Sequence, residues 1–595
     1  MSNFNDFNNP QVAKLPKHLR QFIVDQHYEK YTPIDQAVWR YVMRQNYSYL
    51  KQVAYYPYIK GLQRAGLSIE RIPDLQNMND NLGKLGWGAV TVDGFIPPSA
   101  FMEYQAYRVL VIAADIRQIN HIEYTPAPDI IHESAGHAPI IADPDYNNYL
   151  SYFGSIGTKA MFSARDFELY EAIRHLSILK EAIGVNPLEI EKAEANLQHL
   201  AENLGEPSEM ALLSRLHWWT VEYGLIGSLD DPKIYGAGLL SSIGESASCR
   251  NPEVKKIPYT IDAINYNYDI TKPQPYLFVT ETFQNLIDVL EQFADTMAFR
   301  RGGAESIKKA IDCKNVATAV YSSGLQVSGI FTTMGVDASG QLSFLKTTGG
   351  TALAAAAKQL EGHSKFYHKD GFSSPVGKLK DADKPLEEFS ADELTTLGIA
   401  EGKKADFTFE SGIHVKGRVT RILRHEEKTI LIVMEDCTVR ESDGNVLFQP
   451  EWGTYDMAVG EKIVSVFNGA ADKDAFEENT YVSTKHTEKI VYDEATQNLH
   501  KIYAKVRSVR EQEQGEGELP ALFKYLQQDY PADWLCALEI LEIVFHRKLF
   551  PELETEIRLY LQQKAEKQVA YKKLITDGLY VIEHPVTQLI TEEDL

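Results

Sequence analysis

Two histidines five positions apart, His132 and His137, constrain the local fold of this chain more than any other feature. Each residue of a regular α-helix turns by about 100°, so a five-residue step leaves the two imidazole rings roughly 140° apart. Histidines four positions apart, as in the HExxH motif of zinc peptidases, would instead share one face. Convergence of these two rings therefore requires a helical bulge or a frayed helix end, which Gly136 and Pro139 favour.

An isolated acid far downstream, Glu222, completes a candidate metal site with His132 and His137. Two neutral imidazoles and one carboxylate leave a divalent ion with a net charge of about +1 and with open positions for oxygen ligands. This donor set is typical of non-haem Fe(II) oxygenases. By residue type alone, two helix-capping histidines and a solvated glutamate would be an equally good interpretation.

Three segments around these residues form a more specific pattern than the donor set. They are residues 125–139 (TPAPDIIHESAGHAP), 218–225 (WWTVEYGL) and 235–245 (YGAGLLSSIGE). They resemble, in order, the TPEPDxxHExxGHxP iron core, the third-ligand helix and the YGAGLLSSxGE segment of the pterin-dependent aromatic amino acid hydroxylases. The likeness runs from about residue 20 to about residue 300, and it implies that His132, His137 and Glu222 bind Fe(II).

The resemblance also implies which residues bind an amino-acid substrate. Arg117 matches the arginine that binds the substrate carboxylate, a group for which guanidinium is the natural bidentate partner, and Asp129 matches the acid that holds this arginine. Trp218 matches an aromatic residue that lines the pocket of the substrate ring. By likeness only, the pocket is completed by Thr125, Pro128, Gly238 and Ser241. A surface ion pair and a core tryptophan are the interpretations that residue type alone would favour.

A pterin site is implied by the segment that contains Gly94, Phe95 and Ile96, followed by Phe101. A flat bicyclic ring would stack on Phe101, while its amide-like edge pairs with backbone groups of the 94–96 loop. These residues match the loop that receives tetrahydropterin in the family.

Two further residues have implied roles in catalysis. Glu133 is poorly placed to bind the same ion as both histidines, and in the family this acid faces the pterin. Ser241 would donate or accept a hydrogen bond with the first histidine and so fix its ring, as a metal-binding imidazole usually requires.

The implied activity is hydroxylation of the aromatic ring of an amino acid by O2 with tetrahydropterin, either tetrahydrobiopterin or a related reduced pterin, and Fe(II). Conversion of L-phenylalanine to L-tyrosine, the phenylalanine 4-monooxygenase reaction, is the preferred interpretation. Val111 stands where a polar ring is expected in that branch, and residues 298–303 replace a proline-rich stretch. Hydroxylation of tyrosine or tryptophan therefore remains an alternative.

Two functions of other classes compete with this interpretation. A His2Glu zinc hydrolase would use Glu133 as a general base, but the five-residue histidine spacing disfavours it. A non-catalytic interaction protein would require that the first half of the chain be an enzyme that has lost its activity. The presence of all three expected metal ligands argues against that loss.

Charge and cysteine content restrict the partners and the compartment. The net charge of −23 opposes a broad phosphate-binding surface, so neither nucleic acid nor an anionic membrane is expected as a partner. The four cysteines form no CxxC pair, which argues against a thiolate metal site and a disulfide framework. A reducing compartment, the cytoplasm, is expected. The sequence does not indicate the oligomeric state.

The 595 residues are enough for several cores. The fold expected is a mainly α catalytic domain of the aromatic amino acid hydroxylase type, then a small β-rich domain and a helical C-terminal tail. Alternating apolar residues and the Asp443-Gly444 hairpin signal carry the β assignment. The expected ranges are 1–340 with a helical insertion at about 160–210, a connecting region at 341–394, the β-rich domain at 395–505, and a linker with a helical module at 506–595.

A second histidine pair, His363 and His368, also has a spacing of five. Because no third ligand is visible near it in the sequence, we expect both side chains to be solvated rather than to bind a metal.

Overall fold

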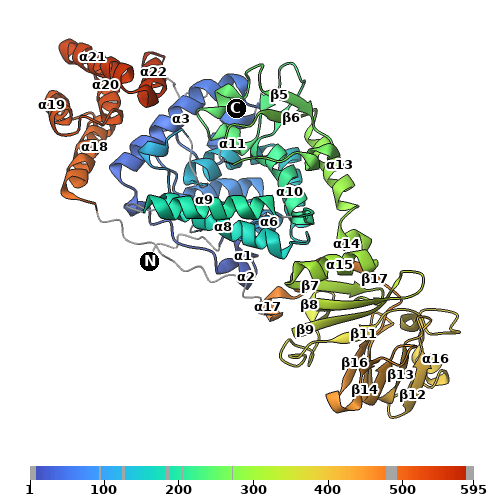
Figure 1. Cartoon of the computed structure of the whole chain (residues 1–595). Coiled ribbons are helices and arrows are strands. Elements are labelled where there is room, and N and C mark those ends of the chain that lie inside the picture. Colours follow the sequence, from blue (N-terminus) through green and yellow to red (C-terminus); the bar gives the residue numbers. More distant parts are fainter. Residues whose placement is uncertain are drawn as a thin grey trace.

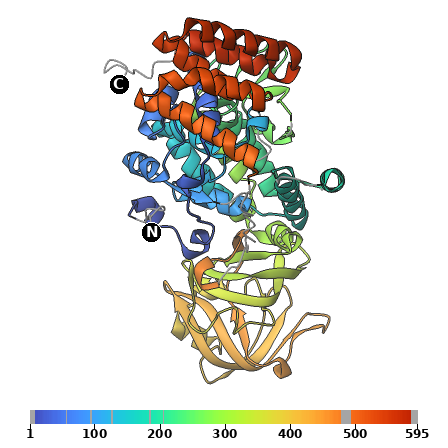
Figure 2. The same ribbon diagram turned by 90° about the vertical axis from the view of Figure 1, so that its left-hand side faces the viewer.

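The computed structural model describes residues 8–55, 57–92, 96–123, 128–181, 186–203, 205–270, 272–476 and 492–584. A helical domain forms the middle of the molecule, a β-rich part lies at one end, and the C-terminal helices lie at the other (Figures 1 and 2). Among the described residues, none of the helices combines the length and the apolar character that crossing a bilayer would need.

The helical domain is mainly α, as predicted. Its helices are α1 (Pro10–Ala13), α2 (Lys17–Arg20), α3 (Pro33–Val53), α4 (Pro57–Arg64), α5 (Leu75–Leu82), α6 (Pro98–Ala106), α7 (Pro144–Gly157), α8 (Ala164–Glu181), α9 (Pro187–Glu202), α10 (Glu209–His217), α11 (Ala237–Leu240), α12 (Glu245–Ser248) and α13 (Phe283–Ala294), with the π-helical segments η4 (Ile131–His137) and η6 (Trp218–Glu222). Its strands are β1 (Gly88–Val92), β2 (Val109–Ala113), β3 (Leu225–Ile226), β4 (Lys233–Ile234), β5 (Lys255–Pro258) and β6 (Tyr276–Thr280).

The longest of these helices, α3, begins at a capping box in which Thr32 and Asp35 exchange side-chain to backbone hydrogen bonds, with Pro33 at the first helical position. The helix is buried on most of its circumference, including Trp39 and Val42 at 0% exposure. A helix buried on several sides must contact neighbours on several sides, and α3 lies between the rest of the helical domain and the C-terminal helices.

The expected insertion corresponds to α8 and α9, which pack against each other. Asn186 caps α9, and Pro187 occupies its first position. Gly184, the other predicted turn residue, lies outside the described residues.

The β-rich part contains two antiparallel sheets with separate cores. Two short helices, α14 (Ala298–Arg301) and α15 (Gly303–Cys313), precede it, and α16 (Ala391–Thr396) and α17 (Lys473–Phe476) belong to it. One sheet contains β7 (Val316–Tyr321), β8 (Leu325–Val336), β9 (Leu342–Ala355), β10 (Lys358–Gln359), β11 (Ser373–Pro375) and β17 (Ile463–Asn468). The other contains β12 (Lys404–Thr408), β13 (His414–His425), β14 (Lys428–Arg440), β15 (Val446–Phe448) and β16 (Tyr455–Ala458).

The strands of the β-rich part thus start at Val316, before residue 340, where the catalytic domain was expected to end. The expected connecting region 341–394 contains β9, β10, β11 and α16. The β9 segment runs through Thr347-Thr348-Gly349-Gly350-Thr351 and a series of alanines, whose small side chains give only a weak apolar alternation. Its pairing partners, β8 and β11, are what make it a strand.

The C-terminal module contains α18 (Glu494–Gln512), α19 (Leu519–Asp529), α20 (Leu535–Arg547), α21 (Pro551–Lys567) and α22 (Val569–Glu583). It docks on α3 through α18, α20 and α22. Gly578 of α22 lies so close to α20 that a Cβ there would be 2.4 Å from a methyl carbon of Leu538. The tail predicted as helical is therefore a packed part of the molecule rather than a separate appendage.

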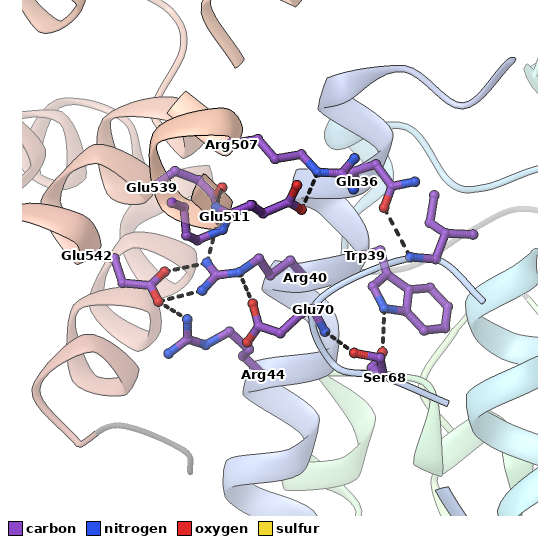
Figure 3. Close-up of polar contacts among 12 residues, drawn as sticks. Gln36, Trp39, Arg40, Arg44, Ser68, Glu70, Arg507, Glu511, Glu539 and Glu542 are labelled. Atoms are coloured by element: carbon purple, nitrogen blue, oxygen red, sulfur yellow. Dashed lines mark hydrogen bonds and ion pairs between the residues drawn. The ribbon is translucent and has the colours of Figure 1, made fainter. Parts of the chain in front are cut away.

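A buried cluster of charges holds this interface together (Figure 3). Arg40 of α3 donates to Glu539 at 2.8 Å and forms a two-point ion pair with Glu542 of α20. Arg44 also pairs with Glu542, and Arg510 of α18 pairs with Glu539. Buried ion pairs of this kind are costly to break one partner at a time, because the remaining charge stays buried.

Candidate metal centre and aromatic pocket

The segment that contains both histidines is π-helical from Ile131 to His137. A π-helix closes its hydrogen bonds between residues five apart, so its wider turn returns the fifth residue to nearly the same face. The rings of His132 and His137 accordingly lie 5.0 Å apart between centroids and at 88° to each other. Gly136 allows the segment to approach α11, since a Cβ there would be 2.7 Å from the carbonyl oxygen of Ala237. The bulge required by the sequence is present.

Glu222 ends a second π-helical segment, η6, which continues α10. Its Oε2 lies 3.2 Å from His132 Nε2, and its Oε1 lies 3.4 Å from His137 Nε2. One donor atom from each of the three residues lies within 4.8 Å of the others. The exposed fractions of the side chains are 18% for His132, 2% for His137 and 12% for Glu222, so the cluster opens only slightly to solvent.

The charges of the cluster are strongly interdependent. Burial alone would raise the pKa of Glu222, but the imidazoles of His137 and His132 outweigh it and hold this pKa well below its ordinary value. Burial raises the pKa of Glu133 to about 8, with His137 opposing the shift and Glu222 adding to it. Burial lowers the pKa of His217 to about 4, against the attraction of Glu222.

Several buried polar atoms here find no hydrogen-bond partner within the described part of the chain. They include both ring nitrogens of His137 and Oε2 of Glu133. Buried polar atoms are normally satisfied, and a group of orphaned donors and acceptors around one point is what an ion with its ligands would complete. The residues present therefore fit a divalent metal ion.

Ser241 orients the first histidine. Its Oγ lies 3.0 Å from His132 Nδ1 and donates to the carbonyl oxygen of Ala237 at 2.8 Å. Because that hydroxyl hydrogen points to Ala237, Oγ accepts from Nδ1–H, which leaves Nε2 of His132 as the free lone-pair nitrogen toward Glu222. The expected hydrogen bond between Ser241 and the first histidine is observed.

Arg117 and Asp129 lie buried next to this centre, at 5% and 3% exposure. Asp129 also accepts from the backbone N–H of Arg117 at 2.9 Å and of His132 at 3.0 Å. Burial would raise the pKa of Asp129, but the Arg117 guanidinium outweighs it and lowers this pKa. Arg117 Nη1 is also 3.4 Å from the carbonyl oxygen of Ser241. Because Asp129 accepts hydrogen bonds from both the Arg117 side chain and the His132 backbone, this one acid positions both the arginine and the first histidine.

Trp218 is held in a stack of aromatic rings. It stacks on Tyr223 at 4.6 Å and on Tyr268 at 4.4 Å between ring centroids. Its buried Nε1 has no hydrogen-bond partner within the described residues. Gly238 packs against Tyr223, where a Cβ would lie 2.8 Å from the ring, and Pro128 is exposed. Thr125 lies outside the described residues.

The residues expected to hold the pterin are only partly described, since Gly94 and Phe95 lie outside the described residues. Ile96 packs against the N-terminal cluster of buried residues, and Phe101 on α6 contacts His217 edge to face at 5.7 Å. His217 Nδ1 in turn lies 3.8 Å from Glu222 Oε1. Phe101 is thus one residue removed from the metal cluster.

Sequence reasoning missed His217 and Tyr268. His217 directly precedes the segment that contains Glu222. Extending that segment by one residue toward its N-terminus would have suggested His217 as a further ring beside Glu222. Tyr268 lies in a run of alternating tyrosines and asparagines, and nothing local in that run indicates its stacking on Trp218.

A mainly helical domain with two imidazoles and a carboxylate converging on one point defines a non-haem metal enzyme. Residues 23–168 and 177–302 match the family described as biopterin-dependent aromatic amino acid hydroxylase. These residues make up less than half of the chain, so it is the helical domain that is similar to this family, and the gap in the match falls within α8.

Individual relatives match the same half of the chain. Phenylalanine-4-hydroxylase of Chromobacterium violaceum is 28% identical over 277 residues, which are 46% of this chain and 78% of the relative. The protein of the same name from Dictyostelium discoideum is 31% identical over 236 residues, 39% of this chain and 43% of the relative. A crystal structure of the C. violaceum enzyme with iron(III) and 7,8-dihydrobiopterin is 26% identical and covers 49% of this chain and 93% of its own, with a TM-score of 0.36.

Proposed function

We propose that this protein is a phenylalanine 4-monooxygenase that converts L-phenylalanine to L-tyrosine with tetrahydropterin and O2 at Fe(II). The observation that carries the proposal is the convergence of His132, His137 and Glu222 beside the buried pair of Arg117 and Asp129. A metal centre and a carboxylate-binding site thus lie next to each other inside a family domain whose relatives include phenylalanine-4-hydroxylases.

Fe(II) would be held by Nε2 of His132, Nε2 of His137 and the Glu222 carboxylate. The three side chains come from the two segments η4 and η6, and three protein ligands would leave coordination positions of the ion for other oxygen ligands. When bound, the iron and the pterin supply the activation of O2. Little water reaches the ligand side chains, since the His137 side chain is only 2% exposed.

The amino-acid substrate would bind through its carboxylate to Arg117. Asp129 takes one N–H from Nε and one from Nη2, and Nη1 makes two long hydrogen bonds, to the carbonyls of Ile122 and Ser241. A substrate carboxylate would bind at the Nη1–Nη2 edge in place of these long hydrogen bonds. Because Asp129 also accepts from the backbone of His132, the substrate and the metal would be positioned by the same acid.

The aromatic ring of the substrate would lie near Trp218, Pro128 and Gly238, with Thr125 completing the pocket. Since the faces of Trp218 already stack on Tyr223 and Tyr268, the tryptophan would contact the substrate through its edge. The pterin would stack on Phe101 and pair with the backbone of Gly94, Phe95 and Ile96, with Glu133 facing it.

The domains are proposed to have different roles. The residues up to 302 that match the family would catalyse the reaction, and the β-rich part and the C-terminal helices would stabilise or regulate the catalytic domain. We place the enzyme in the cytoplasm because none of the four cysteines, all of them buried, forms a disulfide.

One assay tests the proposal. The purified full-length chain is incubated with Fe(II), tetrahydrobiopterin and O2, and with phenylalanine, tyrosine or tryptophan in separate reactions, and the products are identified by mass spectrometry. We expect tyrosine from phenylalanine at the highest kcat/KM. Product from tyrosine or tryptophan alone would reassign the substrate, and iron-loaded protein that hydroxylates none of the three would refute the proposed reaction.

A further inference from the structure

The second histidine pair, His363 and His368, lies in the loop between β10 and β11 of the β-rich part. The expectation that these side chains are solvated is wrong, because the residues are only 5% and 8% exposed. Their rings stack with centroids 5.4 Å apart and an angle of 20°, and Nδ1 of His363 lies 3.2 Å from Nε2 of His368. Two nitrogens of one tetrahedral Zn²⁺ ion, each bound at 2.0–2.1 Å, would lie roughly 3.3 Å apart.

A third donor comes from the other sheet. Asp456 of β16 is 6% exposed, and its Oδ2 lies 3.9 Å from Nδ1 of His368. One donor atom from each of the three residues lies within 4.8 Å of the others, as in the catalytic cluster. The third ligand was invisible in the sequence because Asp456 follows His368 by 88 residues (456 − 368) and reaches it only through the packing of the two sheets.

The carboxylate of Asp456 has an unsatisfied atom. Its Oδ1 is buried and has no hydrogen-bond partner within the part of the chain that the structure describes, and the Tyr367 hydroxyl is a further polar group that faces this carboxylate. A buried carboxylate oxygen without a partner is costly, and no lysine or arginine forms an ion pair with Asp456 among the described residues. A hydrogen-bonded chain from Asp456 through His368 to His363 would account for the histidines, but it would leave this oxygen without a partner.

The backbone places the three residues at the contact between the two sheets. The N–H of Leu353 donates to the carbonyl of His363 at 3.0 Å, and the N–H of Thr351 donates to that of His368 at 3.1 Å, so the loop is tied to β9. Asp456 pairs with Val433 of β14 in the five-stranded sheet. β11 and β16 are in contact where the sheets meet (Figure 1). A common ligand of the three side chains would therefore join one sheet to the other.

We propose that His363, His368 and Asp456 form a second metal site, separate from the catalytic centre, that takes a divalent transition-metal ion such as Zn²⁺. Two neutral imidazoles and one carboxylate are the donors that this ion prefers, and a water molecule would complete the tetrahedron. The Oδ2 of Asp456 lies 3.9 Å from Nδ1 of His368, whereas Nε2 of that ring faces His363, so metal binding requires the His368 ring or the carboxylate to move until one nitrogen of His368 faces both partners. The ion fixes the 360–372 loop between the sheets and stabilises the β-rich part.

Metal counting on the full-length chain tests this proposal. In the His132→Ala/Glu222→Ala background, which lacks two ligands of the catalytic cluster, the chain is stripped with a chelator, titrated with Zn²⁺ or Co²⁺, desalted and analysed by mass spectrometry. We expect one tightly bound equivalent and, with Co²⁺, the visible absorption bands of a tetrahedral nitrogen and oxygen site. If this background retains no equivalent of either metal, the second site does not exist.

Substitutions locate the bound ion. In the same background, His368→Ala and the isosteric Asp456→Asn are each expected to weaken binding at least 10-fold and to abolish the rise in Tm on metal addition. His414→Ala is the matched control, because His414 pairs with Asp406 at 2.7 Å on the surface of the same part, and it should bind metal as the background does. If the Asp456→Asn protein retains as much metal as the background, the assignment is wrong. Asp456→Asn remains informative even if His368→Ala fails to fold.

Discussion

Arg117 and Asp129 form a bidentate ion pair in which Nε lies 2.8 Å from Oδ2 and Nη2 lies 2.9 Å from Oδ1. The pair is buried, and the same carboxylate accepts from the backbone N–H of His132. A single acid therefore fixes a guanidinium and the start of the histidine-bearing π-helix. This geometry holds the guanidinium rigidly, unlike a flexible charge on the surface.

Replacing Arg117 with Ala should raise the KM for the amino acid strongly while the iron content stays normal. The loss corresponds to about 2 to 5 kcal/mol for a desolvated charge pair, because the substrate carboxylate loses its partner and Asp129 is left without its counterion. Steady-state kinetics with phenylalanine at fixed pterin concentration measure it. Arg117→Lys keeps the charge but not the pair of parallel donors, so its KM for phenylalanine should lie between those of the unmodified protein and Arg117→Ala. If Arg117→Ala has the same KM as the unmodified protein, the carboxylate binds elsewhere.

Removing the hydroxyl of Ser241 should weaken iron binding without removing a ligand. Ser241→Ala deletes the acceptor for Nδ1–H of His132, so the ring is no longer held in one tautomer and orientation. Outer partners of metal-binding histidines contribute roughly 10- to 100-fold in affinity. Iron affinity by competition with a chelator gives this factor. Ser155 is an exposed serine on α7 whose hydroxyl bonds only a local carbonyl, so Ser155→Ala is the control and should leave the affinity unchanged.

The C-terminal helices should depend on Arg40 for their docking on α3. Arg40→Ala leaves Glu542 and Glu539 buried with less compensating charge, a change that costs about 3 to 5 kcal/mol when one member of a buried pair is removed. Limited proteolysis and thermal unfolding should show release of residues 494–583 before the rest of the chain. The matched control is Arg558→Ala, which breaks the more exposed pairs with Glu554 and Glu583 and should cost about 0 to 1 kcal/mol.

The contact between the helical domain and the β-rich part should weaken as the pH rises above neutrality. Burial opposes protonation of His18, but its hydrogen bonds with Glu103 and Asp474 outweigh burial and raise its pKa above the ordinary value of 6.5. A raised pKa stabilises the folded state fully below 6.5, and this stabilisation is lost as the pH passes upward through the folded-state pKa. Urea unfolding between pH 6 and pH 9 should show this loss, and His18→Gln should remove the slope. An unchanged slope in His18→Gln would assign it to other groups.

The sequence was sufficient for the π-helical bulge because its determinant is local. The five-residue spacing of His132 and His137 already required a bulge, and the structure contains a π-helix at that point. The hydrogen bond from His132 to Ser241 and the ion pair of Arg117 with Asp129 were expected from motifs that occupy short segments. The π-helix follows from the spacing of two residues, whereas the hydrogen bond of His132 with Ser241 joins residues 109 positions apart and was expected from the family resemblance.

The remaining features depend on packing between distant segments. The start of strand structure at Val316 was missed because β8 and β9 contain many threonines, glycines and alanines and show little apolar alternation. The burial of His363 and His368 depends on β16, and the charged face of α20 is explained only by its contact with Arg40 and Arg44 of α3. A glutamate on a helix normally indicates solvent, so Glu539 and Glu542 gave no local sign of an interface.

Loss of the metal and loss of the pterin should give separable defects. Glu222→Ala should lower the iron occupancy and abolish hydroxylation, because two imidazoles alone hold the ion weakly and neutralise none of its charge.

Phe101→Ala should leave iron bound but weaken pterin binding, by about 0.5 to 1.5 kcal/mol for the aromatic contact beyond the loss of area. Phe101 also packs edge to face on His217, so the comparison includes Phe101→Leu, which keeps apolar volume and removes the stacking face. Iron content, the KM for pterin and the tyrosine formed per pterin consumed are measured for all three variants. Full iron loading with normal turnover in Glu222→Ala would remove this residue from the metal site, and an unchanged KM for pterin in both Phe101 variants would place the pterin elsewhere.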